Sequence, residues 1–194
     1  MKLIKNLTLA LLAGLLACNT LAAAIEINGV KVEDSSTVNG VKLQLNGAGT
    51  RYKAMFKVYV AAVYLGKKTS TPEELVNQPG PKRFSVTMVR DIDAAELGKL
   101  LTRGMEDNTG KAEMSKLIPG LMRMSQIFSD QKKMVTGDNF TIDWVRGAGS
   151  IITVKGKVQG EPFKEPEFFK ALMSIWLGPV PADWKLKDAL LGIK

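Results

Sequence analysis

The stretch Leu45–Leu65 constrains the fold of this chain more than any other part of the sequence. It opens with Asn46-Gly47-Ala48-Gly49, a run of residues that is typical of a turn. Phe56–Leu65 then reads FKVYVAAVYL, an apolar run that favours a strand. Arg51 lies at the start of the strand region, where it is a candidate anchor for an anionic or oxygen-rich small molecule. The alternative is a surface arginine that pairs with a carboxylate.

The N-terminal residues have the pattern of a secretory signal peptide. Lys2 and Lys5 form a basic start, and Leu7–Ala17 is an uncharged apolar run that is short for a bilayer span. We therefore expect a signal peptide over residues 1–24 and a single domain over residues 25–194. Cleavage is expected after Ala22, Ala23 or Ala24.

This leader predicts that the protein is periplasmic or secreted. The alternative is a lipoprotein anchored at Cys18. The preceding Leu15-Leu16-Ala17 puts a bulky leucine where lipoprotein signals usually carry a small or β-branched residue, so we favour the soluble product. Beyond the leader there is no further apolar run of about 20 residues, and we expect no stable membrane span.

Residue types that are missing exclude several classes of function. The sequence contains no histidine, and its one cysteine, Cys18, lies in the leader. A zinc site of the usual His/Cys kind and a Ser-His-Asp or Cys-His nucleophile therefore cannot be built. A general base would have to be a carboxylate, a lysine or a tyrosine. We expect neither a metal nor a cofactor.

The charge of the chain is mildly basic. Removing the two leader lysines from a net charge of +8 leaves +6 on the expected mature protein. Such a charge can attract anionic ligands or membrane surfaces. The basic residues are scattered rather than clustered, and we therefore expect no nucleic-acid partner.

Turn and capping signals divide the remaining chain into short strands and amphipathic helices. Asn28-Gly29 predicts a hairpin, and Asn39-Gly40 precedes a half-buried strand. Further strands are expected at Arg83–Arg90, Phe140–Val145, Ser150–Lys155 and Val158–Phe163. Helices are expected after the caps Thr71 and Asp93, over Lys111–Ser129 with a break or kink at Pro119-Gly120, over Pro166–Leu177 and over Trp184–Leu191. Hairpin signals dominate, which predicts an α+β domain whose mainly antiparallel sheet is covered on one face by helices.

Several of these segments together resemble the chalcone isomerase family. GAGTR followed by KVYVAAVYL resembles a Gly-x-Gly-x-Arg that leads, in that family, into a strand ending in Val-Tyr-Leu. SVTMVRDI, GDNFTIDWV and FFKALMSIWLG resemble its bacterial exported branch, the chalcone isomerase-like proteins. The resemblance extends from about Val41 to Gly192. It implies an open-faced β-sandwich, in which the ligand cleft lies between a large antiparallel sheet and a layer of helices.

Two functions occur in the family, and the matching residues differ between them. The enzymes close a chalcone to a flavanone, whereas other members bind fatty acids and hold the carboxylate with an Arg and a Tyr. The family arginine matches Arg51. Tyr59 matches a position that is threonine in the enzymes and tyrosine in the fatty-acid-binding members. The helical Asn of the enzymes matches Asn108, so the resemblance implies Arg51, Tyr59 and Asn108 as ligand-binding residues.

The resemblance favours binding over catalysis. The Tyr and Lys that the enzymes carry before the helical Asn are replaced here by Leu101 and Gly104, or by Leu97 and Leu100 in a second alignment. We therefore expect an exported, non-catalytic protein that binds a small apolar ligand with an acidic head group, such as a fatty acid. The alternative is an isomerase or intramolecular lyase acting on a chalcone-like substrate, because positioning and anion stabilisation by one arginine could support weak catalysis.

The spacing between Arg51 and Tyr59 conflicts with a shared site if the chain runs straight. The two residues are eight positions apart. In one straight strand they would lie on the same face but about 26 Å from each other. A shared carboxylate requires a bend or tight turn near Tyr52–Ala54, and no glycine or proline marks one there.

Overall fold

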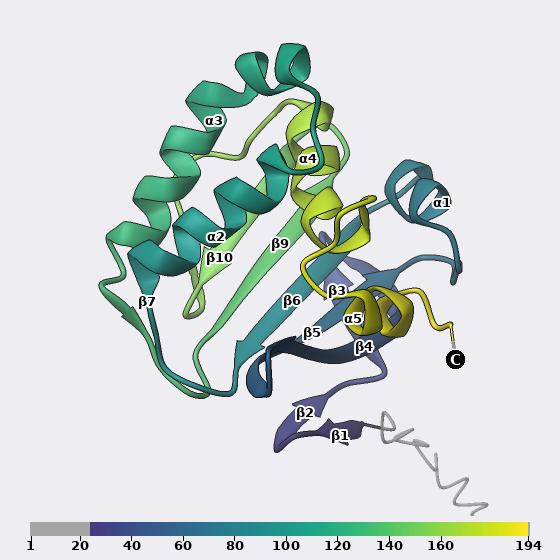
Figure 1. The fold of residues 1–194 in the computed structure, drawn as a ribbon. Helices are drawn as coiled ribbons and strands as arrows, with labels where there is room; N and C mark the ends of the chain where they lie inside the picture. Colours follow the sequence, from purple (N-terminus) through teal and green to yellow (C-terminus); the bar gives the residue numbers. More distant parts are fainter. Residues whose placement is uncertain (1–23, 194) are drawn as a thin grey trace, which may run out of the picture.

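A seven-stranded antiparallel sheet forms the centre of the molecule (Figure 1). The computed structural model describes residues 24–193, so the predicted signal sequence before Ala24, including Cys18, lies outside the described residues. In order across the sheet, the strands are β11 (Lys157–Val158), β10 (Gly149–Val154), β9 (Asn139–Val145), β6 (Lys82–Met88), β5 (Phe56–Leu65), β4 (Val41–Lys53) and β3 (Ser35–Val38). Two small antiparallel pairs accompany the sheet: the hairpin of β1 (Ile25–Ile27) with β2 (Val30–Val32), and β7 (Ile92–Asp93) with β8 (Lys133–Met134), which are far apart in the sequence.

Five helices lie within the described residues. They are α1 (Pro72–Asn77), α2 (Ala94–Glu106), α3 (Lys111–Ser129), α4 (Pro166–Leu177) and α5 (Trp184–Leu190). Figure 1 shows α2, α3 and α4 together over one face of the sheet, with α5 against β4 and β5. The predicted α+β architecture, an antiparallel sheet under a helical layer, is confirmed. No helix between residues 24 and 193 is long and apolar enough to span a membrane.

Short sequence patterns predicted the positions of most of these elements correctly. Asn28-Gly29 and Asn39-Gly40 form the β1–β2 and β3–β4 turns, with positive φ angles at all four residues. The side chain of Thr71 accepts a hydrogen bond from the Glu74 amide at the start of α1, and that of Asp93 caps α2 in the same way. These short polar residues satisfy amide groups that a helix start leaves without partners.

The two faces of the sheet are buried by different parts of the chain. On the helical side, Phe84, Val86 and Met88 of β6 pack in the main core, as their alternation predicts. On the opposite side, Val60 and Tyr64 of β5 pack with residues of β2, β3 and β4 in a smaller core. The sheet is thus covered by helices on one face and, in part, by the N-terminal hairpin on the other.

The predicted turn at Asn46–Gly49 is wrong, because this segment lies inside β4. Its glycines serve the packing of α5 instead. A Cβ atom on Gly47 would lie 2.1 Å from the Ala189 carbonyl oxygen, and one on Gly49 would lie 2.7 Å from the Ala189 Cβ. The Asn46 side chain donates a hydrogen bond of 2.7 Å to the Leu190 carbonyl, and this bond stabilises the contact between β4 and α5. Glycine is therefore required here for close approach and not for a turn.

Two smaller predictions are also corrected. The break considered at Pro119 does not occur, because α3 is one helix through this residue, which lies on its exposed side while Leu117 and Leu121 are buried on the other. The strand expected over Val158–Phe163 is reduced to β11 and a single bridge at Phe163. Gly160 takes a positive φ of 62° and Pro162 has no amide hydrogen, so the chain leaves the sheet between them.

Candidate functional site

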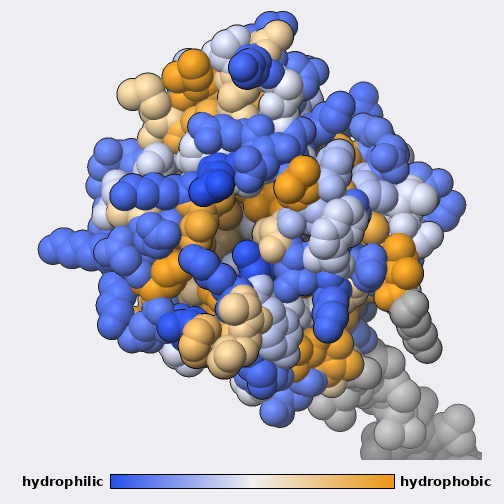
Figure 2. Space-filling view, in the orientation of Figure 1, coloured by the Kyte–Doolittle hydropathy of each residue, from blue (hydrophilic) through white to orange (hydrophobic). Residues whose placement is uncertain are grey.

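A cavity of about 470 Å³ lies between the β4–β5 hairpin, α2 and the loop that follows α4. Its walls are largely apolar, with Val58 and Leu97 facing it from opposite sides. Arg51, Lys53 and Tyr59 line it from the sheet side, and Glu96 and Arg103 of α2 line it from the helical side. Figure 2 shows the opening as a hollow with an apolar interior and a hydrophilic rim. The arrangement suits a molecule with one anionic end and an apolar body.

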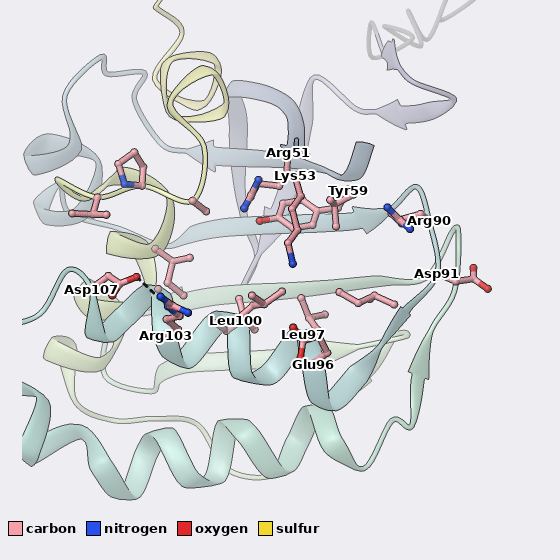
Figure 3. Close-up of a pocket in the computed structure, with 18 residues that line it drawn as sticks. Arg51, Lys53, Tyr59, Arg90, Asp91, Glu96, Leu97, Leu100, Arg103 and Asp107 are labelled. Atoms are coloured by element: carbon pink, nitrogen blue, oxygen red, sulfur yellow. Dashed lines mark ion pairs between the residues drawn. The ribbon is translucent and has the colours of Figure 1, made fainter. Parts of the chain in front are cut away.

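The hairpin brings Arg51 and Tyr59 together. The chain reverses at Ala54 and Met55, so that β4 and β5 run antiparallel and Arg51 is the direct cross-strand partner of Tyr59. The straight strand considered from the sequence is therefore wrong, and the separation of about 26 Å does not arise. Figure 3 shows the Tyr59 hydroxyl beside the Arg51 side chain, above α2. The reversal uses Ala54 at a φ of 52°, a conformation usually marked by glycine or asparagine.

Tyr59 has a specific hydrogen-bond partner that the sequence did not reveal. The indole nitrogen of Trp176, on α4, donates a hydrogen bond of 2.8 Å to the Tyr59 hydroxyl oxygen. Trp176 is itself fixed by its ring contact with Phe84, at 4.1 Å between centroids. Because the oxygen accepts from the indole, the hydroxyl hydrogen remains for a second partner. A buried indole N–H needs an acceptor, and that need was the signal available in the sequence.

The electrostatic surroundings keep Tyr59 a hydrogen-bond donor. Burial raises the pKa of the Tyr59 hydroxyl above its usual value of 10.0, while the bond from Trp176 and the charge of Arg51 oppose that rise. The phenol is thus neutral throughout the physiological range. A neutral hydroxyl can donate its hydrogen to a carboxylate, whereas a phenolate would repel one.

Arg51 carries a charge that has no counterion within residues 24–193. None of the ion pairs in this part of the chain involves its guanidinium. The carboxylate of Asp183 is used elsewhere, since it accepts from the amides of Tyr52 (2.9 Å) and Leu186 (3.1 Å) at the start of α5. The surface ion pair considered for Arg51 is therefore not formed with any carboxylate of residues 24–193. A half-buried guanidinium without a carboxylate favours an anionic ligand with two oxygens.

Asn108 lies behind the cavity wall rather than in it. Its amide nitrogen donates to the carbonyls of Gly104 and Val180, and its amide oxygen accepts from the Val180 amide, all at 2.8 Å. Val180 and the next two residues line the cavity, whereas Asn108 does not. The structure thus gives the Asn108 side chain a bracing role between the end of α2 and the loop after α4. It does not join Arg51 and Tyr59.

The α2 wall lacks the Tyr and Lys that the resemblance places there in the enzymes. Leu97, Leu100, Leu101 and Gly104, which cover both alignments of the missing Tyr and Lys, all line the cavity. At Gly104 a Cβ atom would lie 2.9 Å from the Ile175 Cγ2 atom of α4. A longer side chain at this position would require the two helices to move apart. The wall can contact an apolar group but offers no proton donor at these positions.

Arg103, Asp107 and Asp91, three of the other charged residues that line the cavity, have partners of their own. Arg103 of α2 and Asp107, the residue that follows this helix, form an ion pair of 3.8 Å (Figure 3). Asp91 pairs with Lys133 at 2.8 Å. No group of three or more metal-ligating side chains occurs among residues 24–193. Lys53 and Arg90 also line the cavity without an ion pair among residues 24–193. Arg51 and Tyr59 differ from them in being direct cross-strand partners, which suits them to hold a ligand's anionic end together.

Comparison with known proteins agrees with this architecture. The family model described as chalcone isomerase-like matches residues 24–192. The chain therefore belongs to the chalcone isomerase-like family. Among solved structures, a fatty-acid binding protein of Arabidopsis thaliana has the same fold, with a TM-score of 0.68 and 13% identity over 87% of this chain and 96% of that chain. No curated protein matches the chain by sequence.

Proposed function

We propose that this protein binds an apolar carboxylate, such as a fatty acid, and does not transform it. The observation that carries the proposal is the pairing of Arg51, which has no counterion within residues 24–193, with the Tyr59 hydroxyl, whose hydrogen is available. The guanidinium would hold the carboxylate through two hydrogen bonds, and the phenol would add a third. The fatty-acid binding protein that shares the fold supports a ligand of this class.

The remainder of the cavity accounts for the apolar part of such a ligand. Its volume of about 470 Å³ lies in the usual range for small-molecule sites. Contact with Leu97, Leu100 and Ile175 would remove methylene groups from water, and each contributes about 0.8 kcal/mol when buried. We expect affinity to rise with chain length until the tail fills the space.

The site supports a lyase or isomerase function less well than it supports ligand binding. An intramolecular addition could use Arg51 to stabilise a phenolate. The α2 positions that match the Tyr and Lys of the enzymes carry leucine and glycine here, so those two side chains are not available for such a reaction. A chalcone incubated with the protein should therefore cyclise no faster than in buffer.

We also propose that the protein acts outside the cytoplasm. This part rests on the leader in the sequence and not on the fold. Cell fractionation with an antibody, together with the N-terminal sequence of the mature protein, would test it. A full-length protein retained in the cytoplasm would contradict export.

The binding proposal can be tested in two steps. Native mass spectrometry of the purified protein should detect bound lipid. Titration with palmitate should then show that Arg51→Ala weakens binding by roughly 10- to 100-fold, the value of a charge-assisted hydrogen bond. Arg146→Ala is the matched control, because Arg146 is exposed in the β9–β10 turn and does not line the cavity.

The ligand itself supplies a second control. Hexadecanol has the same tail but no carboxylate, so Arg51→Ala should change its binding little. If wild type and Arg51→Ala bind palmitate equally, the proposed site is wrong.

A further inference from the structure

The tip of the β4–β5 hairpin exposes apolar side chains next to the cavity. Met55 is 82% exposed and Phe56 is 57% exposed, with Tyr52 at 38% beside them. Figure 2 shows apolar side chains gathered below the hollow, over this end of the hairpin. A contiguous exposed apolar group costs solubility, and such groups commonly mark a contact with another surface.

Cationic side chains surround this apolar tip. Lys53 and Lys57 flank Met55 and Phe56 in the sequence, and the Arg90 guanidinium lies 5.1 Å from the centre of the Phe56 ring. None of these three cations forms an ion pair among residues 24–193. Asp91, the acid next to Arg90, is neutralised by Lys133. The tip therefore presents apolar groups inside a net positive rim.

The tip and the cavity share part of their boundary. Lys53 and Arg90 belong to the rim of the tip and also line the cavity. Arg51, the anchor in the proposed ligand site, lies only two residues before Lys53 on the same strand. A surface that contacts the tip would thus lie beside the cationic end of the cavity.

We propose that the hairpin tip, Tyr52–Lys57 with Arg90, docks on the surface of an anionic lipid bilayer. Met55 and Phe56 would enter the head-group region, while Lys53, Lys57 and Arg90 would contact lipid phosphates. The match of an apolar centre with a cationic rim favours a bilayer over an acidic protein, because a bilayer offers both an apolar interior and a dense negative surface. A role for docking in the exchange of a fatty acid with the bilayer rests on the proposed function. Docking itself needs no ligand.

Vesicle sedimentation tests the docking. The protein should sediment with vesicles of equal parts phosphatidylglycerol and phosphatidylcholine, and much less with pure phosphatidylcholine or at high salt. The double variant Met55→Ser, Phe56→Ser should bind the anionic vesicles roughly tenfold more weakly, since it removes two apolar groups. Met122→Ser is the matched control, because Met122 is 70% exposed on α3, away from the tip.

Each outcome decides the inference. Equal vesicle binding by wild type and the double variant would overturn it, as would an equal loss in Met122→Ser. Residues 1–23 are identical in all variants, so a difference between them reports on the tip. A dimer of the wild type that the double variant loses in size-exclusion chromatography would assign the tip to a second copy instead, and would also overturn docking.

The ligand proposal can fail separately. The double variant should keep the palmitate affinity of the wild type in solution, because neither Met55 nor Phe56 lines the cavity. Vesicle binding without palmitate binding would leave docking in place and reject the ligand. Palmitate binding without vesicle binding would reject docking and leave the ligand proposal in place.

Discussion

Arg51 and Tyr59 face each other across neighbouring strands, with the tight turn at Ala54 and Met55 closing the hairpin between them. One turn thus converts two residues eight positions apart into a cross-strand pair. Side chains of such a pair can contact the same small group. The donor character of both groups makes a carboxylate the natural partner.

Tyr59→Phe should weaken palmitate binding by roughly 5- to 30-fold, because the ligand loses one hydrogen bond while Arg51 remains. The substitution also leaves the buried Trp176 N–H without its acceptor, so the free energy of unfolding should fall by about 1–3 kcal/mol. Isothermal titration and urea unfolding measure the two effects. Tyr64→Phe is the control, since Tyr64 lies in the same strand but packs in the smaller core on the opposite face. Equal affinities of Tyr59→Phe and wild type would remove the phenol from the site.

Asn108→Ala should lower stability more than it lowers affinity. It removes three hydrogen bonds that join α2 to the loop at Val180, and we expect a loss of about 2–4 kcal/mol in the free energy of unfolding. Under conditions where the variant is folded, palmitate affinity should change far less than in Arg51→Ala. A stable variant whose affinity drops as far as that of Arg51→Ala would restore a direct ligand role for Asn108.

Gly47→Ala should destabilise the fold by about 2–3 kcal/mol, because the added Cβ meets the backbone of α5, which cannot yield without moving the helix. Gly66→Ala is the matched control, since a Cβ atom there meets nothing within 4 Å and its φ is not positive. Thermal unfolding of both variants would show the difference. Equal melting temperatures would show that α5 can shift at little cost.

The stability of the protein should depend on Lys82 at alkaline pH. Lys82 is 2% exposed, and its ammonium group donates to the carbonyl of Gln78 at 2.7 Å. Burial lowers the pKa of Lys82 from 10.5 to about 8. Between these two values the unfolded chain binds more protons than the folded one, so the free energy of unfolding should rise with pH across this window.

Urea unfolding of wild type and Lys82→Met at about pH 7 and about pH 10 isolates this contribution. Other groups titrate in both proteins, so the pH effect of Lys82 is the difference between them. The wild type should gain stability relative to the variant as pH rises. The same pH dependence in both proteins would mean that the lysine keeps its ordinary pKa.

The elements with local signals could be predicted from the sequence. The Asn-Gly turns, the caps at Thr71 and Asp93, and the apolar alternation of β6 each depend on a few neighbouring residues. Their order was sufficient for the α+β class and the antiparallel sheet. The pairing of residues far apart in the sequence has no such local signal.

The sequence predicted the residues Arg51 and Tyr59 of the candidate site but not how they are arranged. Ala54 adopts a positive φ without being glycine, so the turn that joins Arg51 to Tyr59 was not evident. The hydrogen bond between Tyr59 and Trp176 joins residues separated by 117 positions, and periodicity alone assigns both to the core. Asn108 matched a family position, yet its hydrogen bonds are with the backbone of its own and a neighbouring segment.

The fit of α5 into the glycines of β4 has a consequence for the order of folding. The bond from Asn46 to the Leu190 carbonyl spans 144 positions, so β4 gains this cover only when a segment far along the sequence docks on it. Contacts of such high sequence separation raise the entropic cost of the rate-limiting step. The hairpin that carries Arg51 and Tyr59 is closed by a local turn, whereas its cover by α5 depends on contacts from the other end of the sequence.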